Sequence, residues 1–522
     1  MPRPQPARGR GVPPMPYIVD RNLKYMCLRA ARHSKELIAL NNLKKNYIAG
    51  VWVSGTSHIE NRNPSDLSDL VGLYAQASSD QLDQALDAAR TAQTEWAAYG
   101  LERKQAVLNA IGTEMMARAE ELGTLLSREE GKPFAEGKGE VYRAGQFFTY
   151  YAAEVLRQLG ETADSVRPGV EIDVRREPVG TVAIISPWNF PIATASWKIA
   201  PALAYGNAIM WKPANLTPAS AHALTEIIAR QDIPKGLFNL VMGAGRDVGQ
   251  RLVESPKVDA ISFTGSVLVG RGIAAAAVQN FTRVQMEMGS KNALLITDDA
   301  DLDLAVTLAL GGAFGGTGQK CTASSRLVVM DAVHDAFVEK LIAGAKAMKV
   351  GSALTSGTQI GPVVSEEQLS ENLAWVETGR AEGAILACGG ERLSMDTEGY
   401  FMSPGVFTGT TNDMAVNREE MFAPLACVIK VASYEEGLNV VNDTNFGLTS
   451  GIVTTNLARA THFRRNARTG VVTVNLPTAG TDYHVPFGGR GDSSYGPREQ
   501  GQTARDFYTI VKTSYIASGT PA

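Results

Sequence analysis

Cys321 is the side chain best suited to covalent chemistry in this 522-residue sequence. It lies in GTGQKCTASSR, and the glycines that precede it allow a ligand to approach closely. A thiolate is a strong nucleophile once nearby positive charge favours it, whereas a lone buried cysteine is usually inert. The residue alone therefore fits both a covalent nucleophile and a core thiol.

Two polar residues elsewhere could assist such a thiol. Glu287 lies in MEMGSKN between two methionines, and apolar surroundings raise a carboxyl pKa toward the range in which it accepts a proton from water or a thiol. Asn189, in SPWNFP, could donate its side-chain amide to a developing oxyanion. Both also have a structural interpretation: a carboxylate satisfied by backbone amides, and an asparagine in a turn.

Two other segments could bind phosphate or ribose. WKPANLTP places Lys212 at the end of a predicted strand, where it could meet a phosphate or be solvated. FTGS opens the predicted helix VLVGRGIAAAA, so Gly265 and Ser266 would present backbone amides to a pyrophosphate, or would only cap the helix. GAGRDVG, from Gly243, has GxGxxxG spacing without a following acidic ribose partner, and we interpret it as a tight turn before a helix.

The elements around these residues predict a sheet that brings strand ends together. From Gly180 the chain alternates regularly, with strands in TVAIISPW, NAIMWKP, GLFNLVMG and VDAISFTGS and helices beginning at Ile192, Thr217 and Asp247. Continuous apolar strands separated by helices indicate a parallel, doubly wound α/β sheet. Such sheets bind ligands at the carboxyl ends of their strands, where the segments above lie.

Composition narrows the class of protein. The net charge of −4 and pI near 6.0 argue against a nucleic-acid-binding surface, and no apolar run approaches the roughly 18 residues of a membrane span. Four cysteines without close spacing suggest neither disulfides nor a metal site. We therefore expect a cytoplasmic globular protein without a bound metal.

Residues 1–45 differ from the rest of the chain. The segment MPRPQPARGRGVPPMP is rich in proline and arginine, and acids occur only at Asp20 and Glu36 before Lys45. This composition fits a targeting peptide or a disordered arm. It also fits a translation start at Met15 or Met26, which is the interpretation that we favour.

Seven ordered segments together resemble the aldehyde dehydrogenase superfamily. SPWNFP, WKPAN, FTGS, EMGSKN, GQKC, EEMFAP and PFGG have that family's order and spacing, and the resemblance covers roughly residues 46–518. It implies two doubly wound parallel-sheet domains and a small β oligomerisation flap. The cofactor-binding domain would comprise residues 46–157 and 181–289, the catalytic domain 290–491, and the oligomerisation strands 158–180 and 505–518.

The resemblance also implies a role for each site residue. Cys321 would attack the aldehyde carbonyl, Asn189 and the Cys321 amide would form the oxyanion hole, and Glu287 would activate the thiol or the hydrolytic water. The cofactor would be NAD or NADP, with a hydride passing from the thiohemiacetal to leave a thioester that water hydrolyses. Its implied binding residues are Trp188, Lys212, Asn215, Gly265, Ser266, Glu420 and Phe422.

Departures from the family pattern bear on the cofactor. The acidic ribose partner expected three residues after Lys212 is Asn215, which removes a carboxylate that would repel a 2′-phosphate. We therefore expect use of both NAD and NADP. The cofactor-facing FGP is FAP here, with Ala423, and a lysine frequent in the family is Gly491.

The substrate is implied less specifically. GTDYHVPFGGRGDSSYGPREQG, MEMGSKNAL and GTGQKCTASSR resemble the branch that oxidises α-ketoglutaric semialdehyde, also called 2,5-dioxopentanoate. Succinic semialdehyde or another short aliphatic aldehyde is the alternative. Lys320 could pair with a distal carboxylate or point away from the pocket. The residues implied to line that pocket are Phe190, Thr194, Trp197, Lys320, Thr322, Thr481 and Phe487.

Other classes of protein fit the sequence less well. A cysteine hydrolase would need a histidine partner, and none of the six histidines lies in a motif beside a nucleophile. A CoA-acylating dehydrogenase would lack the base at Glu287. A non-catalytic binding or structural protein should have lost Cys321 or Glu287, and both are present. By the resemblance, we expect a homodimer or homotetramer acting on a small-molecule aldehyde.

Overall fold

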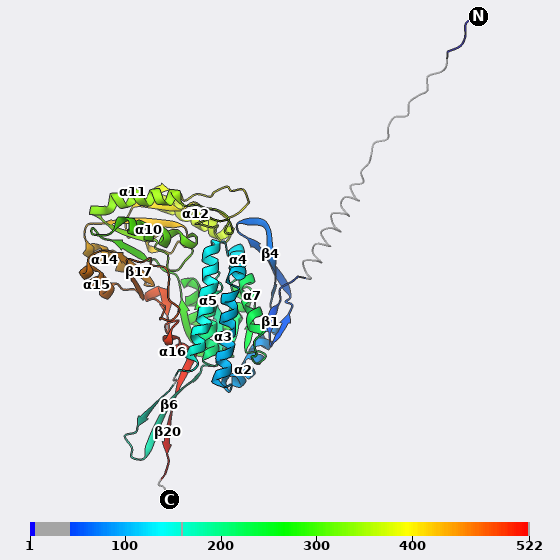
Figure 1. Ribbon diagram of the computed structural model, residues 1–522, viewed down its shortest axis with the longest axis vertical. Helices are drawn as coiled ribbons and strands as arrows, with labels where there is room; N and C mark the ends of the chain where they lie inside the picture. The colour runs from blue at the N-terminus through cyan, green and yellow to red at the C-terminus, as the bar shows by residue number, and fades with distance from the viewer. Residues whose placement is uncertain (6–41, 158–159, 520–522) are drawn as a thin grey trace. The chain divides into compact units, whose positions relative to one another are not determined.

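The structure is a computed structural model that describes residues 1–5, 42–157 and 160–519 (Figure 1). The chain divides into two units, Met1–Leu43 and Lys44–Ala522, and all the elements below belong to the second. Cys27 and most of the expected N-terminal extension lie outside the described residues. Within the described part of the chain, no helix has the length and apolar character needed to cross a membrane.

An eight-stranded sheet contains the strands predicted after Gly180. Its order is β19-β11-β10-β7-β8-β9-β1-β2; β11 to β9 run parallel, whereas β19, β1 and β2 are antiparallel to their neighbours. The bounds are β1 Asn46–Ile48, β2 Val51–Val53, β7 Thr181–Ile185, β8 Ala208–Lys212, β9 Phe238–Leu240, β10 Ala260–Thr264, β11 Arg283–Glu287 and β19 Ser494–Tyr495.

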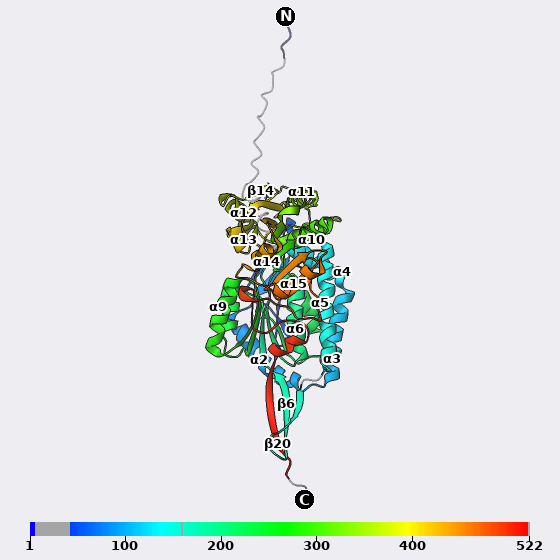
Figure 2. The same ribbon diagram turned by 90° about the vertical axis from the view of Figure 1, so that its left-hand side faces the viewer.

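Helices lie on both sides of this sheet, which is why its parallel strands are almost continuously apolar. In Figure 2, α9 lies on one side of the strands and α3, α4 and α5 on the other. The bounds are α2 Ser79–Ala97, α3 Leu101–Ala117, α4 Ala119–Glu130, α5 Phe134–Glu154, α6 Ala193–Ala204, α7 Pro218–Ala229, α8 Gln250–Glu254 and α9 Val267–Ala277.

The helix starts follow the local sequence. Thr217 precedes α7 with Pro218 at its first turn, where a missing amide costs nothing, and Ser266 caps α9 by accepting from Val269 N–H. The segment from Gly243 does turn into a helix, through a π-helical turn at Gly245–Gly249 before α8. The predicted helix starts near Ile192 and Thr217 are confirmed.

A seven-stranded sheet follows in the chain. Its order is β14-β15-β16-β13-β12-β17-β18, parallel except for the edge pair β14–β15. The strands are β12 Ala293–Ile296, β13 Arg326–Met330, β14 Ile385–Cys388, β15 Gly405–Thr410, β16 Leu425–Val431, β17 Thr449–Val453 and β18 Val471–Val474. Its helices are α10 Leu302–Phe314, α11 Asp331–Ala347, α12 Glu366–Ala381, α13 Ala415–Arg418, α14 Tyr434–Asn442 and α15 Leu457–Asn466.

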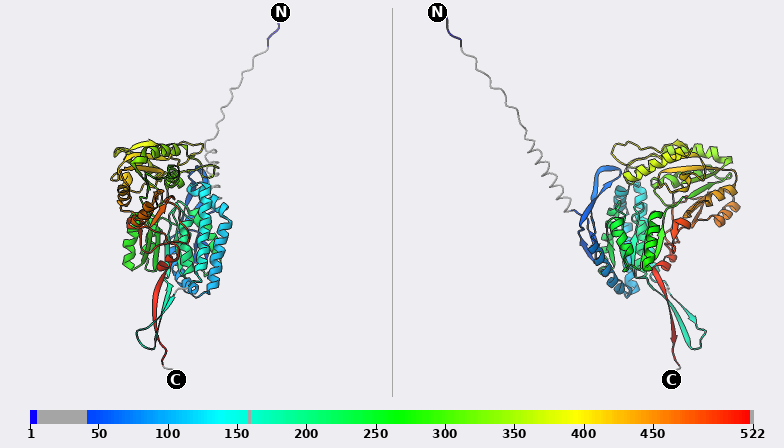
Figure 3. Two further views of the ribbon diagram at one scale, coloured as in Figure 1. Left: turned by 60° about the vertical axis from the view of Figure 1, so that its left-hand side comes forward. Right: turned by 180° about the vertical axis from the view of Figure 1, so that it is seen from behind.

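Two smaller sheets complete the described chain. One is the hairpin of β3 Ser57–Asn63 and β4 Asp66–Gln76. The other has the order β20-β6-β5, with β5 Gly160–Asp164, β6 Val170–Pro178 and β20 Thr509–Ala517. Strands β6 and β20 pair antiparallel over their whole length, and Figure 3 shows them side by side from two directions.

The C-terminal strand begins later than the expected oligomerisation strand of residues 505–518. Residues Arg505–Tyr508 form the helical turn α16, and the strand starts at Thr509. Phe507 and Tyr508 are both buried, although they are consecutive. A strand would turn one of them outward, because successive side chains of a strand alternate between its faces.

Candidate active site

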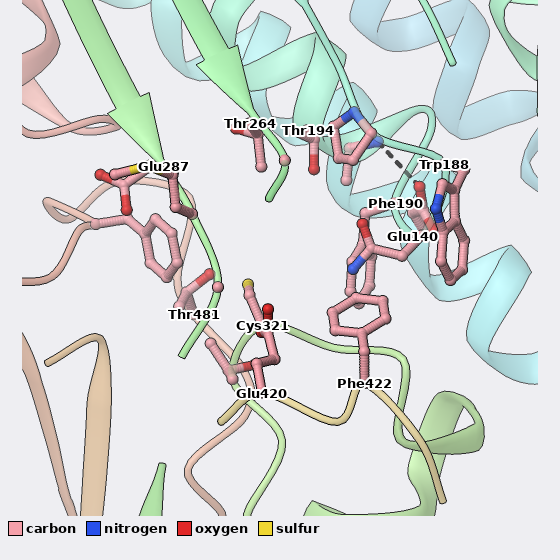
Figure 4. A pocket seen from close by; sticks show the side chains of 18 of the residues that line it. Glu140, Trp188, Phe190, Thr194, Thr264, Glu287, Cys321, Glu420, Phe422 and Thr481 are labelled. Atoms are coloured by element: carbon pink, nitrogen blue, oxygen red, sulfur yellow. Dashed lines mark hydrogen bonds between the residues drawn. The ribbon is translucent and has the colours of Figure 1, made fainter. Parts of the chain in front are cut away.

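A cavity of about 820 Å³ lies where the loops of the two large sheets meet. Figure 4 shows side chains from both converging on it, with Glu287 at the end of β11 and Cys321 in the loop before β13. The sequence-predicted residues that line it are Trp188, Asn189, Phe190, Thr194, Trp197, Gly265, Ser266, Glu287, Cys321, Thr322, Glu420, Phe422, Thr481 and Phe487.

The loop that carries Cys321 has a strained backbone. Gly316, Thr317 and Gly318 have φ values of 57°, 58° and 68°, in the left-handed region that a β-branched threonine rarely adopts. Glu136 of α5 accepts a hydrogen bond from the Gly316 amide at 3.0 Å and so anchors this turn. The strain is therefore compensated by contacts to a helix far away in the sequence.

A second set of bonds fixes the backbone on the other side of the thiol. Asn292 Nδ2 donates to the carbonyl of Cys321 at 2.7 Å and to that of Ala323 at 3.0 Å, and Thr478 donates to the carbonyl of Thr322 at 2.8 Å. The position of Cys321 is thus set by residues that are buried in the seven-stranded sheet region. Asn292 lies within the EMGSKN segment, but its role as a positioning residue was not foreseen.

Cys321 is partly exposed to the cavity and carries a protonated thiol at neutral pH. Burial, with Glu420 and Glu287 nearby, raises its pKa to about 12. Because the thiolate is the nucleophile, this cysteine needs a proton acceptor before it can attack a carbonyl.

Glu287 is a carboxyl group with the properties of such an acceptor. It is the last residue of β11, and its Oε2 accepts a hydrogen bond of 2.5 Å from the Ser494 hydroxyl. Burial raises its pKa well above the usual range, and the neighbouring Glu499 adds to the effect. The sequence indicated apolar surroundings from the two methionines but not Glu499, which forms a buried ion pair with Lys198.

Asn189 is held with its amide beside the Cys321 loop. Its Nδ2 donates to the Gln319 backbone carbonyl at 2.9 Å, and the backbone carbonyl of Asn189 accepts from Lys132 Nζ at 2.6 Å. An asparagine amide has two hydrogens, so one remains for another acceptor. Lys132 is also paired with Glu140 at 2.6 Å, which ties this loop to α5.

Glu420 and Phe422 form another wall. Ser290 N–H donates to Glu420 at 2.8 Å, and burial raises the pKa of Glu420 to about 7. Phe422 has a left-handed backbone with φ 52°, and its ring lies edge-on to Trp188 with centroids 5.4 Å apart. A strained residue that places an aromatic ring in a cavity is typical of a ligand-positioning element.

Three predicted residues do not line the cavity. Lys212 is buried, donates to the Pro213 carbonyl at 3.0 Å, and has a pKa lowered to about 8 by that burial. Asn215 is half-buried in the same loop. Lys320 pairs with Glu136 at 3.3 Å, so its ammonium group is occupied within the protein.

The start of α9 differs from the expectation in one respect. The Gly265 amide donates to the Glu287 carbonyl at 3.1 Å, because the β10–β11 pairing continues to the strand ends. It is therefore not available to a pyrophosphate, and any amides offered there belong to the first turn of α9.

These walls fit a dinucleotide. The Thr264 hydroxyl is buried, has no partner among the described residues, and belongs to the cavity lining just before the α9 N-terminus. A Cβ atom at Gly289 would collide with the carboxylate of Glu420, so the glycine lets this carboxylate lie directly against the backbone. An unpaired hydroxyl, a helix start and an aromatic edge are the groups that phosphate, ribose and a planar ring require.

Helix α5 supplies lining residues that the sequence analysis missed. Glu136, Glu140, Arg143 and Phe147 recur at helical spacing on one face and all line the cavity. That spacing was visible in the sequence, but nothing local indicated that this face meets residues almost 200 positions later. Within the described residues, no cluster of histidine, cysteine, aspartate and glutamate side chains is arranged to hold a metal ion.

Comparison with known proteins gives consistent matches. The model of the aldehyde dehydrogenase family matches residues 52–514. An α-ketoglutaric semialdehyde dehydrogenase of Bacillus subtilis (strain 168) is 39% identical, over 92% of this chain and 99% of the relative. A 2,5-dioxopentanoate dehydrogenase of Saccharolobus solfataricus is 36% identical, over 90% and 98%. Betaine aldehyde dehydrogenase of Staphylococcus aureus, solved in complex with NAD+, is 31% identical with a TM-score of 0.90, over 93% and 97%.

Proposed function

The chain belongs to the aldehyde dehydrogenase family, with that family's fold and NAD(P)-dependent oxidoreductase activity, and we propose that it oxidises α-ketoglutaric semialdehyde to 2-oxoglutarate. The observation that carries this proposal is one cavity lined by both Cys321 and Glu287. A nucleophile and a base that face the same space can act on one carbonyl group.

In this proposal, Cys321 is the covalent nucleophile. Glu287 takes the thiol proton, directly or through water, and the sulfur adds to the aldehyde carbon to give a thiohemiacetal. The remaining Asn189 amide hydrogen and the Cys321 backbone amide stabilise the oxyanion. After oxidation to the thioester and release of that first proton to solvent, Glu287 takes a proton from water. The water oxygen attacks the acyl carbon, the acid is released, and the leaving thiolate regains a proton from Glu287.

When bound, the cofactor would supply a nicotinamide ring as the hydride acceptor. Trp188, Glu420 and Phe422 would hold the nicotinamide riboside, with Ser266 and the first turn of α9 at the pyrophosphate. Lys212 and Asn215 would meet the other ribose, where the missing carboxylate favours use of both NAD and NADP.

Two relatives from different organisms support this assignment of the substrate. Both carry names for the same five-carbon semialdehyde and match this chain over nearly their whole length. Succinic semialdehyde and other short aliphatic aldehydes are the competing substrates, because they present the same reacting group on a different chain.

We also propose the assignment of domains, assembly and location. The eight-stranded sheet would belong to a cofactor-binding domain of residues 46–157 and 181–289, and the seven-stranded sheet to a catalytic domain of 290–491. The sheet β20-β6-β5 would join subunits of a homodimer or homotetramer. Free thiols at Cys321, Cys388 and Cys427 support a reducing location such as the cytoplasm.

The test is a spectrophotometric screen of the full chain. α-Ketoglutaric semialdehyde, succinic semialdehyde and pentanal are each compared by kcat/KM with NAD and with NADP. We expect reduced cofactor to form fastest from the first aldehyde, and no turnover by Cys321→Ala, although that variant still binds cofactor. A higher kcat/KM for either competing aldehyde would overturn the substrate, and turnover by the alanine variant would overturn the mechanism.

A further inference from the structure

The charges around the cavity are unevenly distributed. Among the described residues that line it, Arg143 is the only basic side chain, whereas the acids are Glu136, Glu140, Glu287, Glu371, Glu420 and Asp482. A site that binds an anionic substrate must offset these acids or hold the anion away from them.

Four of these six acids either form an ion pair or have a raised pKa that lowers their negative charge. Glu136 is paired with Lys320 at 3.3 Å, and Glu140 with Lys132 at 2.6 Å. Burial raises the pKa of both Glu287 and Glu420. The other two, Glu371 and Asp482, are exposed to solvent, where water screens them. Arg143 is therefore the one positive charge among the described lining residues, and none of these acids pairs with it.

Arg143 has an aromatic contact instead of a carboxylate. Its guanidinium lies over the ring of Tyr483, 5.4 Å from the centroid, and it forms no ion pair within the described part of the chain. The side chain is half-buried. Stacking on a ring leaves the N–H fork of a guanidinium free to bind a carboxylate in its own plane.

The surroundings of Arg143 are those of an aliphatic substrate. One turn further along α5, Phe147 lies edge-on to Trp197 with centroids 5.8 Å apart. Trp197 in turn contacts Phe487 at 5.6 Å, and all three rings line the cavity. A cation at the border of an apolar wall suits a short carbon chain that ends in a carboxylate.

We propose that Arg143 binds the carboxylate of the substrate and thereby selects semialdehydes that carry a carboxylate over neutral aldehydes. The inference deepens the proposed function and rests on it. It assigns to α5 the role first considered for Lys320, whose ammonium group is already paired with Glu136. The carboxylate is held by Arg143 while the aldehyde at the other end meets Cys321.

The test compares Arg143→Met with a matched control on the same helix. Methionine keeps an unbranched side chain but removes the charge and the N–H donors. Lys138→Met removes a positive charge from α5 at an exposed position that is paired with Glu120 and does not line the cavity. Each variant is assayed with α-ketoglutaric semialdehyde and with pentanal, which has the same chain length and no carboxylate.

We expect Arg143→Met to lower kcat/KM for the semialdehyde at least about 30-fold, mainly through KM, because a partly buried charge pair is lost. Its activity on pentanal should stay at the level of the parent enzyme, and Lys138→Met should match the parent on both. Arg143→Lys should recover part of the loss, since it restores charge without the planar fork.

A binding measurement separates recognition from catalysis. 2-Oxopentanoate has the same carboxylate and keto group but a methyl in place of the aldehyde, so it cannot be oxidised to a thioester. Calorimetry should detect its binding to the full-length parent and to Lys138→Met, and not to Arg143→Met.

The outcomes distinguish the two proposals. If the parent prefers the semialdehyde and Arg143→Met keeps that preference, the assignment of Arg143 is wrong and the proposed function stands. An equal loss on pentanal would show a structural role and overturn the assignment as well. If the parent oxidises pentanal as well as the semialdehyde, the proposed substrate itself is wrong, and this inference fails with it.

Discussion

Cys321 lies among groups that disfavour its thiolate, and this has a measurable consequence in the cofactor-free protein. With its pKa raised to about 12, the thiolate fraction should grow about tenfold per pH unit throughout the neutral range. We therefore predict that alkylation of Cys321 by iodoacetamide accelerates in the same proportion up to about pH 10. Mass spectrometry of the Cys321 peptide follows the rate, and a plateau below about pH 8 would contradict the electrostatics described here.

Asn215 is the residue on which the cofactor prediction depends. Lys212, three residues earlier, has a pKa of about 8 and is mostly protonated near pH 7, so it can attract a 2′-phosphate. We predict that Asn215→Glu lowers kcat/KM for NADP at least about tenfold, through repulsion of that phosphate, and leaves NAD nearly unchanged.

Asn215→Gln is the matched control, because it lengthens the side chain without adding charge. It should leave the ratio of kcat/KM for the two cofactors close to that of the parent. A parent enzyme that already rejects NADP by more than about a hundredfold, equivalent to about 2.8 kcal/mol, would refute the interpretation of Asn215.

The left-handed turn before Cys321 is the element most sensitive to substitution. Gly318 has φ 68°, and a Cβ atom there would collide with the carbonyl of Ala423. We predict that Gly318→Ala lowers the free energy of unfolding by about 1–3 kcal/mol and abolishes activity, since the turn must move.

Gly311 provides the comparison, because it lies inside α10 with open space where a Cβ would be. Gly311→Ala should keep activity and raise stability by up to about 1 kcal/mol. Urea denaturation of both variants measures the difference, and equal stability of the two would disprove the role assigned to the turn.

The elements differ in how far the sequence predicts them. Strands β7, β8 and β10 were predictable because continuous apolar residues end at polar loops. The residues after β7 and β10 do line one cavity, whereas Lys212 and Asn215 at the end of β8 do not. The contribution of α5 was not, because its lining face is defined only by tertiary packing. The Gly265 amide was misjudged for a related reason: strand pairing with β11 continues to the loop and occupies it.

At the scale of the whole molecule, the sheet β20-β6-β5 carries apolar side chains without cover. In β20, Val511 is 58% exposed, Tyr515 60% and Ile516 47%. Strand edges with such side chains pair with other chains unless they are protected. A monomer would leave this surface in water, which supports the proposed oligomer.

We predict that the full chain sediments as a dimer or tetramer and that the double variant Val511→Asp, Tyr515→Asp, at two residues on one face of β20, shifts it toward the monomer. Burying two new charges in an interface costs more free energy than the interface contacts contribute. Leu101→Asp, at a residue of α3 that is 52% exposed, is the control and should leave assembly unchanged. Analytical ultracentrifugation over a range of concentrations measures the oligomeric state of the parent and the variants. A parent that stays monomeric at all concentrations would contradict the proposal.

The covalent route through Cys321, with Glu287 as the base, is tested most directly by trapping the acyl-enzyme. Glu287→Gln keeps the shape of the side chain but removes the carboxylate that accepts protons. The thiol can still lose its proton to water, so acylation is slowed but continues, and thioester hydrolysis should become the slowest step. After mixing this variant with excess α-ketoglutaric semialdehyde and cofactor, quenching in acid and digestion, the Cys321 peptide should carry the acyl group in most molecules, whereas the parent peptide remains largely free. An unmodified Cys321 peptide together with undiminished turnover would contradict the account.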